Sequence, residues 1–197
     1  PDRFGYPITI YAYDSADTIG WYGEEAVVNE WQIVQAPLDC GLNLWEIAAL
    51  PLRAPTAYHL WRRAEGIFRV KVSEERLSTM NVLGFGGGVS ELFLMLAKAR
   101  GHNAWFCSGS KERREALEAM GIPGIDQKAF NRFADRSDTK AFMKEIKKQT
   151  DGEGMHLICD MLRGPVFEAS MVASARQGVV VSAGWQLTRE VRYNSAG

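Results

Sequence analysis

The sequence has few cysteines. Its 197 residues include only three, Cys40, Cys107 and Cys159, and no two of them form a C-x-x-C pair. A disulfide framework or a thiolate zinc site is therefore not expected. Cys107 and Cys159 lie in apolar, strand-like runs, so we expect both to be buried in a protein of a reducing, intracellular compartment.

The sequence also lacks an excess of positive charge and any long apolar run. Lys and Arg number 23 against 24 Asp and Glu, and the net charge is −1. Without a basic excess a nucleic-acid surface is not expected, and no run approaches the roughly 18 apolar residues of a membrane span. With no signal peptide evident, these absences predict a cytoplasmic protein that binds neither nucleic acid nor a membrane.

Metal-ligand spacings are absent too. The three histidines, His59, His102 and His156, stand in no such pattern, so we expect them to be structural or exposed. Asp160 ends a predicted strand, at the edge where open α/β sheets bind ligands. Both a supporting role and a ligand contact fit Asp160.

From residue 81 onward, predicted strands and helices alternate. Apolar runs predict strands at 81–85, 103–107, 155–161 and 178–182. Helical spacing predicts helices at 89–100, 111–120, 137–150 and 165–176, with Leu117 and Met120 of the second facing inward and Ser137 as a helix N-cap. This alternation predicts an α/β fold in which helices flank a parallel sheet.

The first eighty residues have a different pattern. Extended segments are predicted at 7–13 and 25–34. Asn43 and Glu46 have the spacing of a capping box, which would start a helix that ends near Pro51; a second helix would run from about Thr56 through residue 63. We expect a domain boundary between residues 37 and 57.

A glycine cluster, Gly84-Phe-Gly-Gly-Gly-Val-Ser90, joins the strand at 81–85 to the following helix. The position of the last glycine in a G-x-G-x-x-G motif falls on Val89 or Ser90, depending on the alignment. Such a turn predicts a binding site for the diphosphate of a dinucleotide, because its backbone N–H groups and the helix dipole favour negative charge. A turn selected only for tight packing is the alternative.

The next strand bears on the choice of cofactor. Proteins that bind NAD usually have an acidic residue at the end of this strand. Here no acidic residue follows the strand, and the sequence continues Cys107-Ser-Gly-Ser-Lys111, with Arg113 and Arg114 beyond. Hydroxyl groups and cations suit a 2′-phosphate, so NADP is favoured over NAD. A solvated helix face is the alternative for the charged residues.

Several motifs resemble the medium-chain dehydrogenase/reductase superfamily, over residues 20–184. Residues 45–58 resemble its E-x-A-A-L-P…T-A-Y signature. Residues 84–90 resemble the G-x-x-G-G-V-G turn of its quinone oxidoreductases and enoyl reductases, with Ser90 in place of the last glycine, and residues 152–160 resemble a later strand. Residues 10–13 and 124–131 are similar to crotonyl-CoA carboxylase/reductases.

The resemblance implies a partial-length fragment with a partial catalytic, GroES-like β segment at 1–50 and an NADP-binding Rossmann domain, incomplete at its C-terminus, at 51–197. Thr56 would lie beside the nicotinamide, residues 86–89 would hold the pyrophosphate, and Ala183 and Gly184 would line the cleft. Arg53 stands where zinc enzymes of the family have a cysteine, which implies a zinc-free reductase. The predicted cofactor-binding residues are Thr56, Gly84, Gly86, Gly87, Gly88, Val89, Ser108, Ser110, Lys111, Arg113, Ala183 and Gly184.

The first functional hypothesis is an NADP-dependent, zinc-independent oxidoreductase. It would transfer hydride to an activated double bond or carbonyl of a small molecule, such as an enoyl or CoA thioester or a quinone; a carboxylating reaction is a variant. No catalytic residue is assigned, although Tyr22 and Lys111 are candidates for the proton donor. A nucleotide-binding fragment or module of a larger complex without turnover is the second hypothesis. The third hypothesis, suggested by Ser90, is a structural remnant that binds no cofactor.

An exposed apolar edge of the parallel sheet predicts a homo-oligomer.

Overall fold

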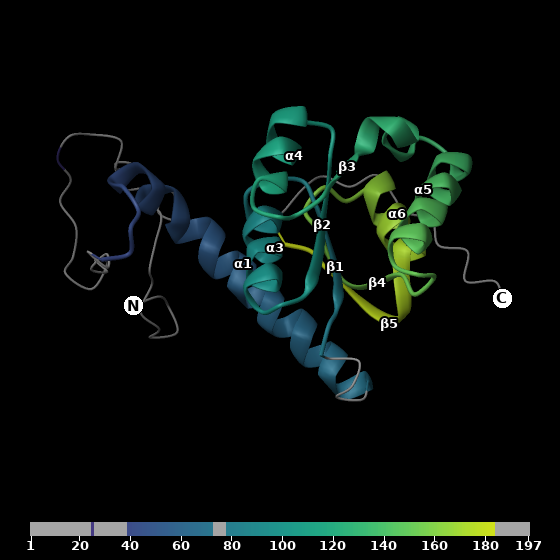
Figure 1. The fold of residues 1–197 in the computed structure, drawn as a ribbon, viewed down its shortest axis with the longest axis horizontal. Coiled ribbons are helices and arrows are strands. Elements are labelled where there is room, and N and C mark those ends of the chain that lie inside the picture. The colour runs from purple at the N-terminus through teal and green to yellow at the C-terminus, as the bar shows by residue number, and fades with distance from the viewer. Residues whose placement is uncertain (1–24, 26–38, 73–77, 184–197) are drawn as a thin grey trace, which may run out of the picture. The chain divides into compact units, whose positions relative to one another are not determined.

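The computed structural model describes residues 25, 39–72 and 78–183 (Figure 1). The predicted extended segment at 7–13, that at 25–34 apart from its first residue, Tyr22 and Gly184 lie outside them. The chain divides into two compact units, residues 1–48 and 49–197. Among the described residues, none of the helices has the length and apolar character needed to cross a membrane.

A parallel sheet of five strands forms the centre of the second unit. Its strands are β1 (Asn81–Phe85), β2 (Asn103–Ser108), β3 (Gly124–Asp126), β4 (Met155–Asp160) and β5 (Ser174–Val181), in the order β3-β2-β1-β4-β5 (Figure 1). Every residue of β1 and β4 is buried, as expected for strands covered on both faces. The predicted α/β fold, a Rossmann-type sheet flanked by helices, is confirmed.

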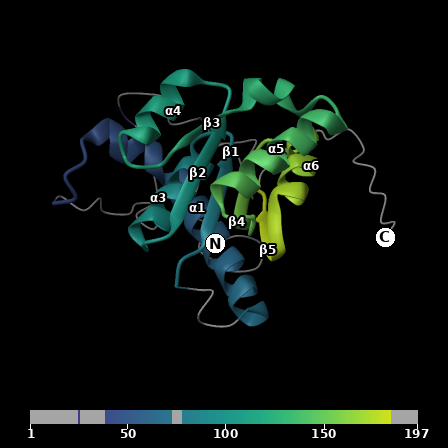
Figure 2. The ribbon, with the colours of Figure 1, turned by 45° about the vertical axis from the view of Figure 1, so that its right-hand side comes forward.

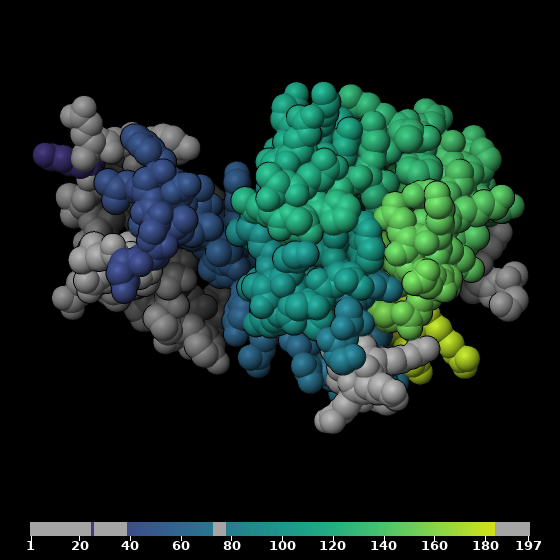
Figure 3. Space-filling view, viewed as in Figure 1, coloured from purple at the N-terminus to yellow at the C-terminus, as the bar shows by residue number. Residues whose placement is uncertain are grey.

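Helices cover both faces of this sheet. One face packs against α1 (Leu44–Lys71), α3 (Val89–Ala99) and α4 (Lys111–Glu118). The other packs against the short 3-10 helix η2 (Gln127–Phe133), α5 (Arg136–Gln149) and α6 (Pro165–Ala173). The two groups of helices separate clearly in Figure 2. In Figure 3 the teal and green segments form much of the surface in view.

Each face has its own aromatic core. On the first, Trp61 of α1 lies with its ring centroid 5.2 Å from that of Phe93 of α3. On the second, Phe85 of β1 contacts the rings of Phe133 and Phe142, at centroid distances of 6.0 and 5.8 Å. The sheet therefore joins two separate hydrophobic clusters.

Helix α1 begins with the predicted capping box. The Asn43 side chain accepts from the Glu46 N–H at 3.0 Å, and the Glu46 carboxylate accepts from the Asn43 N–H at 2.8 Å. The prediction of two helices is wrong, because α1 runs unbroken through Pro51 and Pro55. Both prolines are exposed, so the carbonyls that lose a partner can bond to water, while packing of the following turns maintains the helix.

Four other predictions of detail are wrong. Met120 is 56% exposed, because α4 ends before it and only Leu117, 4% exposed, reaches the core. The N-cap of α5 is Asp135, whose carboxylate accepts from the N–H groups of Ser137 and Asp138. Residues 174–176 belong to β5 rather than to the helix before it, because they pair with β4 from Met155 onward. The strand at 178–182 therefore begins earlier, at residue 174.

The predicted burial of Cys107 and Cys159 is confirmed. Cys107 and Cys159 are fully buried, and burial raises the pKa of both thiols well above the ordinary range. His102 and His156 are buried and accept hydrogen bonds at Nδ1 from the backbone N–H groups of Met80 and Asn81, while His59 is exposed.

We predict that Trp61→Ala lowers the free energy of unfolding by about 3–5 kcal/mol, as expected for loss of a large core side chain. Trp61 is fully buried, stacks on His102 and donates its indole N–H to Glu65. Urea unfolding measures the change. The control, Tyr58→Ala, removes a 47% exposed ring of the same helix and should cost less than about 1 kcal/mol. Equal losses would contradict this account of the core.

Candidate functional site

The glycine turn lies between β1 and α3, at the carboxyl end of β1. Gly86 and Gly88 have φ values of 98° and 52°, a region that favours glycine. Gly88 is the N-cap residue of α3, and no side chain caps this end of the helix. The first turn of α3, in which the Ser90 N–H donates to the Gly87 carbonyl at 3.3 Å, and the positive end of the helix dipole therefore lie at the carboxyl edge of the sheet, an arrangement suited to an anion.

Helix α3 packs directly on β1. A Cβ atom on Gly84 would lie 2.8 Å from Cδ1 of Leu94 and 3.3 Å from Cβ of Ser90. Ser90, which stands at the last position of the glycine motif, is fully buried, and its Oγ has no hydrogen-bond partner among the described residues. The missing side chain of Gly84 makes room for Ser90, so strand and helix still approach closely.

Two arginines from different helices reach the glycine turn. Arg113 of α4 lies across Gly87, where a Cβ would clash with its Nη1. Its Nε is 3.9 Å from the Glu91 carboxylate, a loose ion pair. Arg53 of α1 lies against the next glycine: its Cδ and Nε are 3.2 Å from the position of a Cβ on Gly88. The sequence prediction included Arg113 in this site and did not include Arg53.

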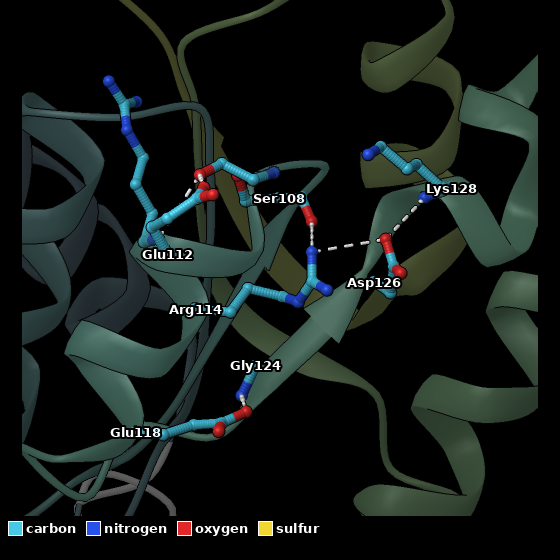
Figure 4. Close-up of polar contacts among 9 residues, drawn as sticks. Ser108, Glu112, Arg114, Glu118, Gly124, Asp126 and Lys128 are labelled. Atoms are coloured by element: carbon cyan, nitrogen blue, oxygen red, sulfur yellow. Dashed lines mark hydrogen bonds and ion pairs between the residues drawn. The ribbon is translucent and has the colours of Figure 1, made fainter.

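The loop after β2 lies next to the turn, because β1 and β2 are neighbours in the sheet. Ser110 is the N-cap of α4, and its Oγ accepts from the Arg113 N–H at 3.3 Å. The Ser108 hydroxyl accepts from the Ser110 N–H at 3.2 Å. Arg114 donates to the Ser108 carbonyl at 2.6 Å and to the Asp126 carboxylate at 3.3 Å (Figure 4). The Asp126 carboxylate, at the tip of β3, is thereby neutralised.

Lys128 adds a cation to this loop that the sequence prediction missed. Its backbone N–H donates to Asp126 at 2.9 Å, and its Cε lies 3.7 Å from the position of a Cβ on Gly109. In Figure 4 its ammonium group extends toward the loop that carries Ser108. The pKa of Glu112 is lowered by a backbone hydrogen bond, by the Ser110 hydroxyl, and by the positive charges of Lys128 and Arg114.

Asp160 ends β4 on the other side of β1. One carboxylate oxygen accepts from the backbone N–H groups of Leu162 and Arg163, at 2.8 and 2.9 Å. The other is buried without a hydrogen-bond partner among the described residues, and burial raises the pKa of this carboxyl group. Met161 and Leu162 in turn lie 3.3 and 3.4 Å from the position of a Cβ on Gly86. Asp160 thus shapes the loop that borders the turn.

The other predicted residues are less closely grouped. The Thr56 hydroxyl donates to the Leu52 carbonyl within α1, at 2.7 Å. Lys111 is exposed and pairs with Glu115 at 3.4 Å, and Ala183, half-buried, follows β5. No three His, Cys, Asp or Glu side chains of the described residues gather as a metal site would require. The structure therefore brings together Gly86, Gly87, Gly88, Val89 and Arg113, with Ser108 and Ser110 on the adjacent strand end.

Comparisons with known proteins agree with this geometry. A family model described as "Zinc-binding dehydrogenase" matches residues 88–196. The highly reducing polyketide synthase poxF of Penicillium oxalicum is 25% identical over 94% of this chain, and a mycocerosic acid synthase-like polyketide synthase of Mycolicibacterium smegmatis is 30% identical over 73%. The aligned part is only 6% of either synthase.

Solved structures share the fold. An alcohol dehydrogenase superfamily protein from Novosphingobium aromaticivorans matches 76% of this chain and 40% of its own, with 26% identity and a TM-score of 0.54. Mycobacterial Rv1454c, solved with NADPH, matches 76% of this chain and 41% of its own (21% identity, TM-score 0.59). A putative enoyl reductase domain of a polyketide synthase matches 72% of this chain and 71% of its own (20%, TM-score 0.51).

We predict that the wild type loses stability relative to Asp160→Asn as the pH rises. Burial in the folded state raises the pKa of Asp160, so the folded protein binds this proton more tightly than the unfolded chain does. The stability that this proton contributes is fully present below the unfolded pKa, about 3.9, and is lost as the pH rises through the raised folded value. Urea unfolding of both proteins at intervals of about half a pH unit, from about pH 3.5 to 8, measures the difference in their free energies of unfolding. A pH-independent difference would contradict this environment for Asp160.

Proposed function

The chain belongs to the zinc-binding dehydrogenase family, within the medium-chain dehydrogenase/reductase superfamily, and on that premise we propose that it is an NADP-dependent oxidoreductase. The substrate we propose is an activated double bond or carbonyl in a small molecule, such as an enoyl thioester or a quinone. The chain spans 6% of the length of the first curated relatives and about 40% of the length of the first solved structures. The activity is therefore a proposal.

The glycine turn carries this proposal. Two glycines with positive φ precede an uncapped helix N-terminus, so its residues fit a diphosphate bound by backbone N–H groups. Gly86, Gly87, Gly88 and Val89 would hold it, and Gly84 would keep α3 close to the strand. Arg113, which now lies across Gly87, would have to move aside and could then pair with a phosphate.

The choice of NADP rests on the loop after β2. Ser108, Ser110 and Arg113 would bind the 2′-phosphate, with Lys111 nearby, and Lys128 adds a further cation there. Asp126 would not repel the phosphate, because Arg114 neutralises it. The related Rv1454c was solved with NADPH, which supports the same cofactor here.

The proposed chemistry needs no metal in the protein. When bound, NADPH supplies a hydride, and the protein orients the nicotinamide against the substrate. Thr56, Ala183 and Gly184 are the proposed contacts of the nicotinamide. The cation Arg53 and the absence of a metal-ligand cluster among the described residues support zinc independence. The polyketide synthase relatives, named as highly reducing, support an enoyl thioester as substrate.

Two further features belong to the proposal. Among the described strands β5 pairs only with β4, so an available sheet edge supports a homo-oligomer. A cytoplasmic location stays a prediction.

We predict that the wild type binds NADPH at least tenfold more tightly than NADH. Arg113→Ala and Lys128→Ala should each weaken NADPH by about tenfold, because each loses a charge-assisted hydrogen bond, and should change NADH by less than about threefold. Quenching of tryptophan fluorescence during titration measures both constants. Lys144→Ala, an exposed lysine of α5, is the control and should change neither. Equal losses for the two cofactors would contradict the assignment of the 2′-phosphate.

We predict NADPH oxidation by crotonyl-CoA or by a quinone, unchanged by EDTA. Absorbance at the reduced nicotinamide band follows the reaction. Tight binding of NADPH without oxidation by any member of an enoyl-thioester and quinone panel would instead favour a nucleotide-binding module. Loss of activity with EDTA that zinc restores would contradict zinc independence.

A further inference from the structure

The buried stripe of α1 continues into an arginine. The core residues Ala57, Trp61, Ala64 and Phe68 recur at spacings of four, three and four residues, which is one face of a helix. Four residues before Ala57, on the same face, stands Arg53. Arg53 itself is exposed, so the buried part of the stripe ends before it, and the helical spacing places Arg53 at the edge of the packed face.

Packing of the stripe fixes where Arg53 lies. The ring of Trp61 contacts Phe93 of α3, so α1 and α3 lie against each other on one face of the sheet. Two turns before Trp61, the stripe reaches the beginning of α3. There Cδ and Nε of Arg53 lie 3.2 Å, and Cζ 3.6 Å, from the position of a Cβ on Gly88. The guanidinium is therefore placed beside the N-cap residue of α3.

This placement concentrates positive charge. The N-terminus of α3 is uncapped and carries the positive end of the helix dipole, which disfavours a cation beside it. Arg113 approaches the neighbouring Gly87 from α4, and its contact with Glu91 is long, at 3.9 Å. Arg53 has no carboxylate partner within the described ranges 39–72 and 78–183. Two guanidinium groups and a helix dipole thus converge on the turn with one distant carboxylate to balance them.

We propose that Arg53 binds the diphosphate of the dinucleotide from the side of α1. This inference rests on the proposed function. A diphosphate between the Arg53 guanidinium and the α3 N-terminus would balance both of these positive charges, while the 2′-phosphate of NADPH would pair with Arg113. Because NADPH and NADH share the diphosphate, Arg53 contributes equally to the affinity for both, whereas the residues after β2 distinguish them.

Three variants of the full chain test the inference, with NADPH and NADH titrated against each. Arg53→Ala should weaken both cofactors by about tenfold and to the same extent. Arg53→Glu should weaken both by about a hundredfold or more, through added repulsion. A carboxylate beside a helix N-terminus is favourable, so Arg53→Glu should unfold at no lower temperature than the wild type. The control Arg62→Ala removes an exposed arginine nine residues, or about 14 Å, further along α1 and should change neither constant.

Each other outcome overturns the inference in a distinguishable way. A loss for NADPH alone would mean that Arg53 contacts the 2′-phosphate instead. Unchanged constants in both Arg53 variants would mean that it is a surface side chain without a role in binding. A wild type that binds neither cofactor would remove the proposed function, and this inference with it. Equal weakening by Arg62→Ala would mean that charge at a distance, not contact, explains the effect.

Discussion

The close contact between β1 and α3 determines the rest of this structure. At Gly84 the strand has no side chain, and Ser90 and Leu94 of the helix fill the space. This contact directs the beginning of α3 to the carboxyl edge of the sheet and leaves Gly86, Gly87 and Gly88 to make the turn. The position of the α3 N-terminus and of its helix dipole follows from it.

Helix α1 supplies the second constraint. Trp61 packs α1 against α3, and the helix segment two turns before Trp61 lies beside the glycine turn as a result. Beside β2, on the side away from β1, the ion pair between Arg114 and Asp126 connects α4 to β3 and orders the loop after β2. The site is therefore assembled from three connections, each of which also contributes to the core.

Local patterns in the sequence predict most of the second unit. Strands buried on both faces are apolar throughout, and helices such as α3 have an apolar stripe, so the alternation from Asn81 onward is visible without a structure. The errors occur where packing overrides local preference. The unbroken α1 through two prolines and the early start of β5 at Ser174 both depend on neighbours that are distant in the sequence.

The candidate site divides in the same way. The glycine turn and the hydroxyls after β2 are local motifs, so the sequence predicts them. Lys128 follows a strand of three residues that its residue pattern alone does not reveal, and Arg53 precedes the site by more than thirty residues. Only the tertiary fold brings them to the turn, although the spacing of Arg53 from Ala57 is a signal that could have been read.

The two prolines of α1 flank Arg53 closely. Pro51 and Pro55 have no N–H to donate, so the turn between them is held by fewer backbone hydrogen bonds than the turns around Trp61. Helices bend most readily at such points. The turn that carries this arginine is therefore held less by its own backbone than the turns around Trp61, so the position of Arg53 depends on the packing that follows it.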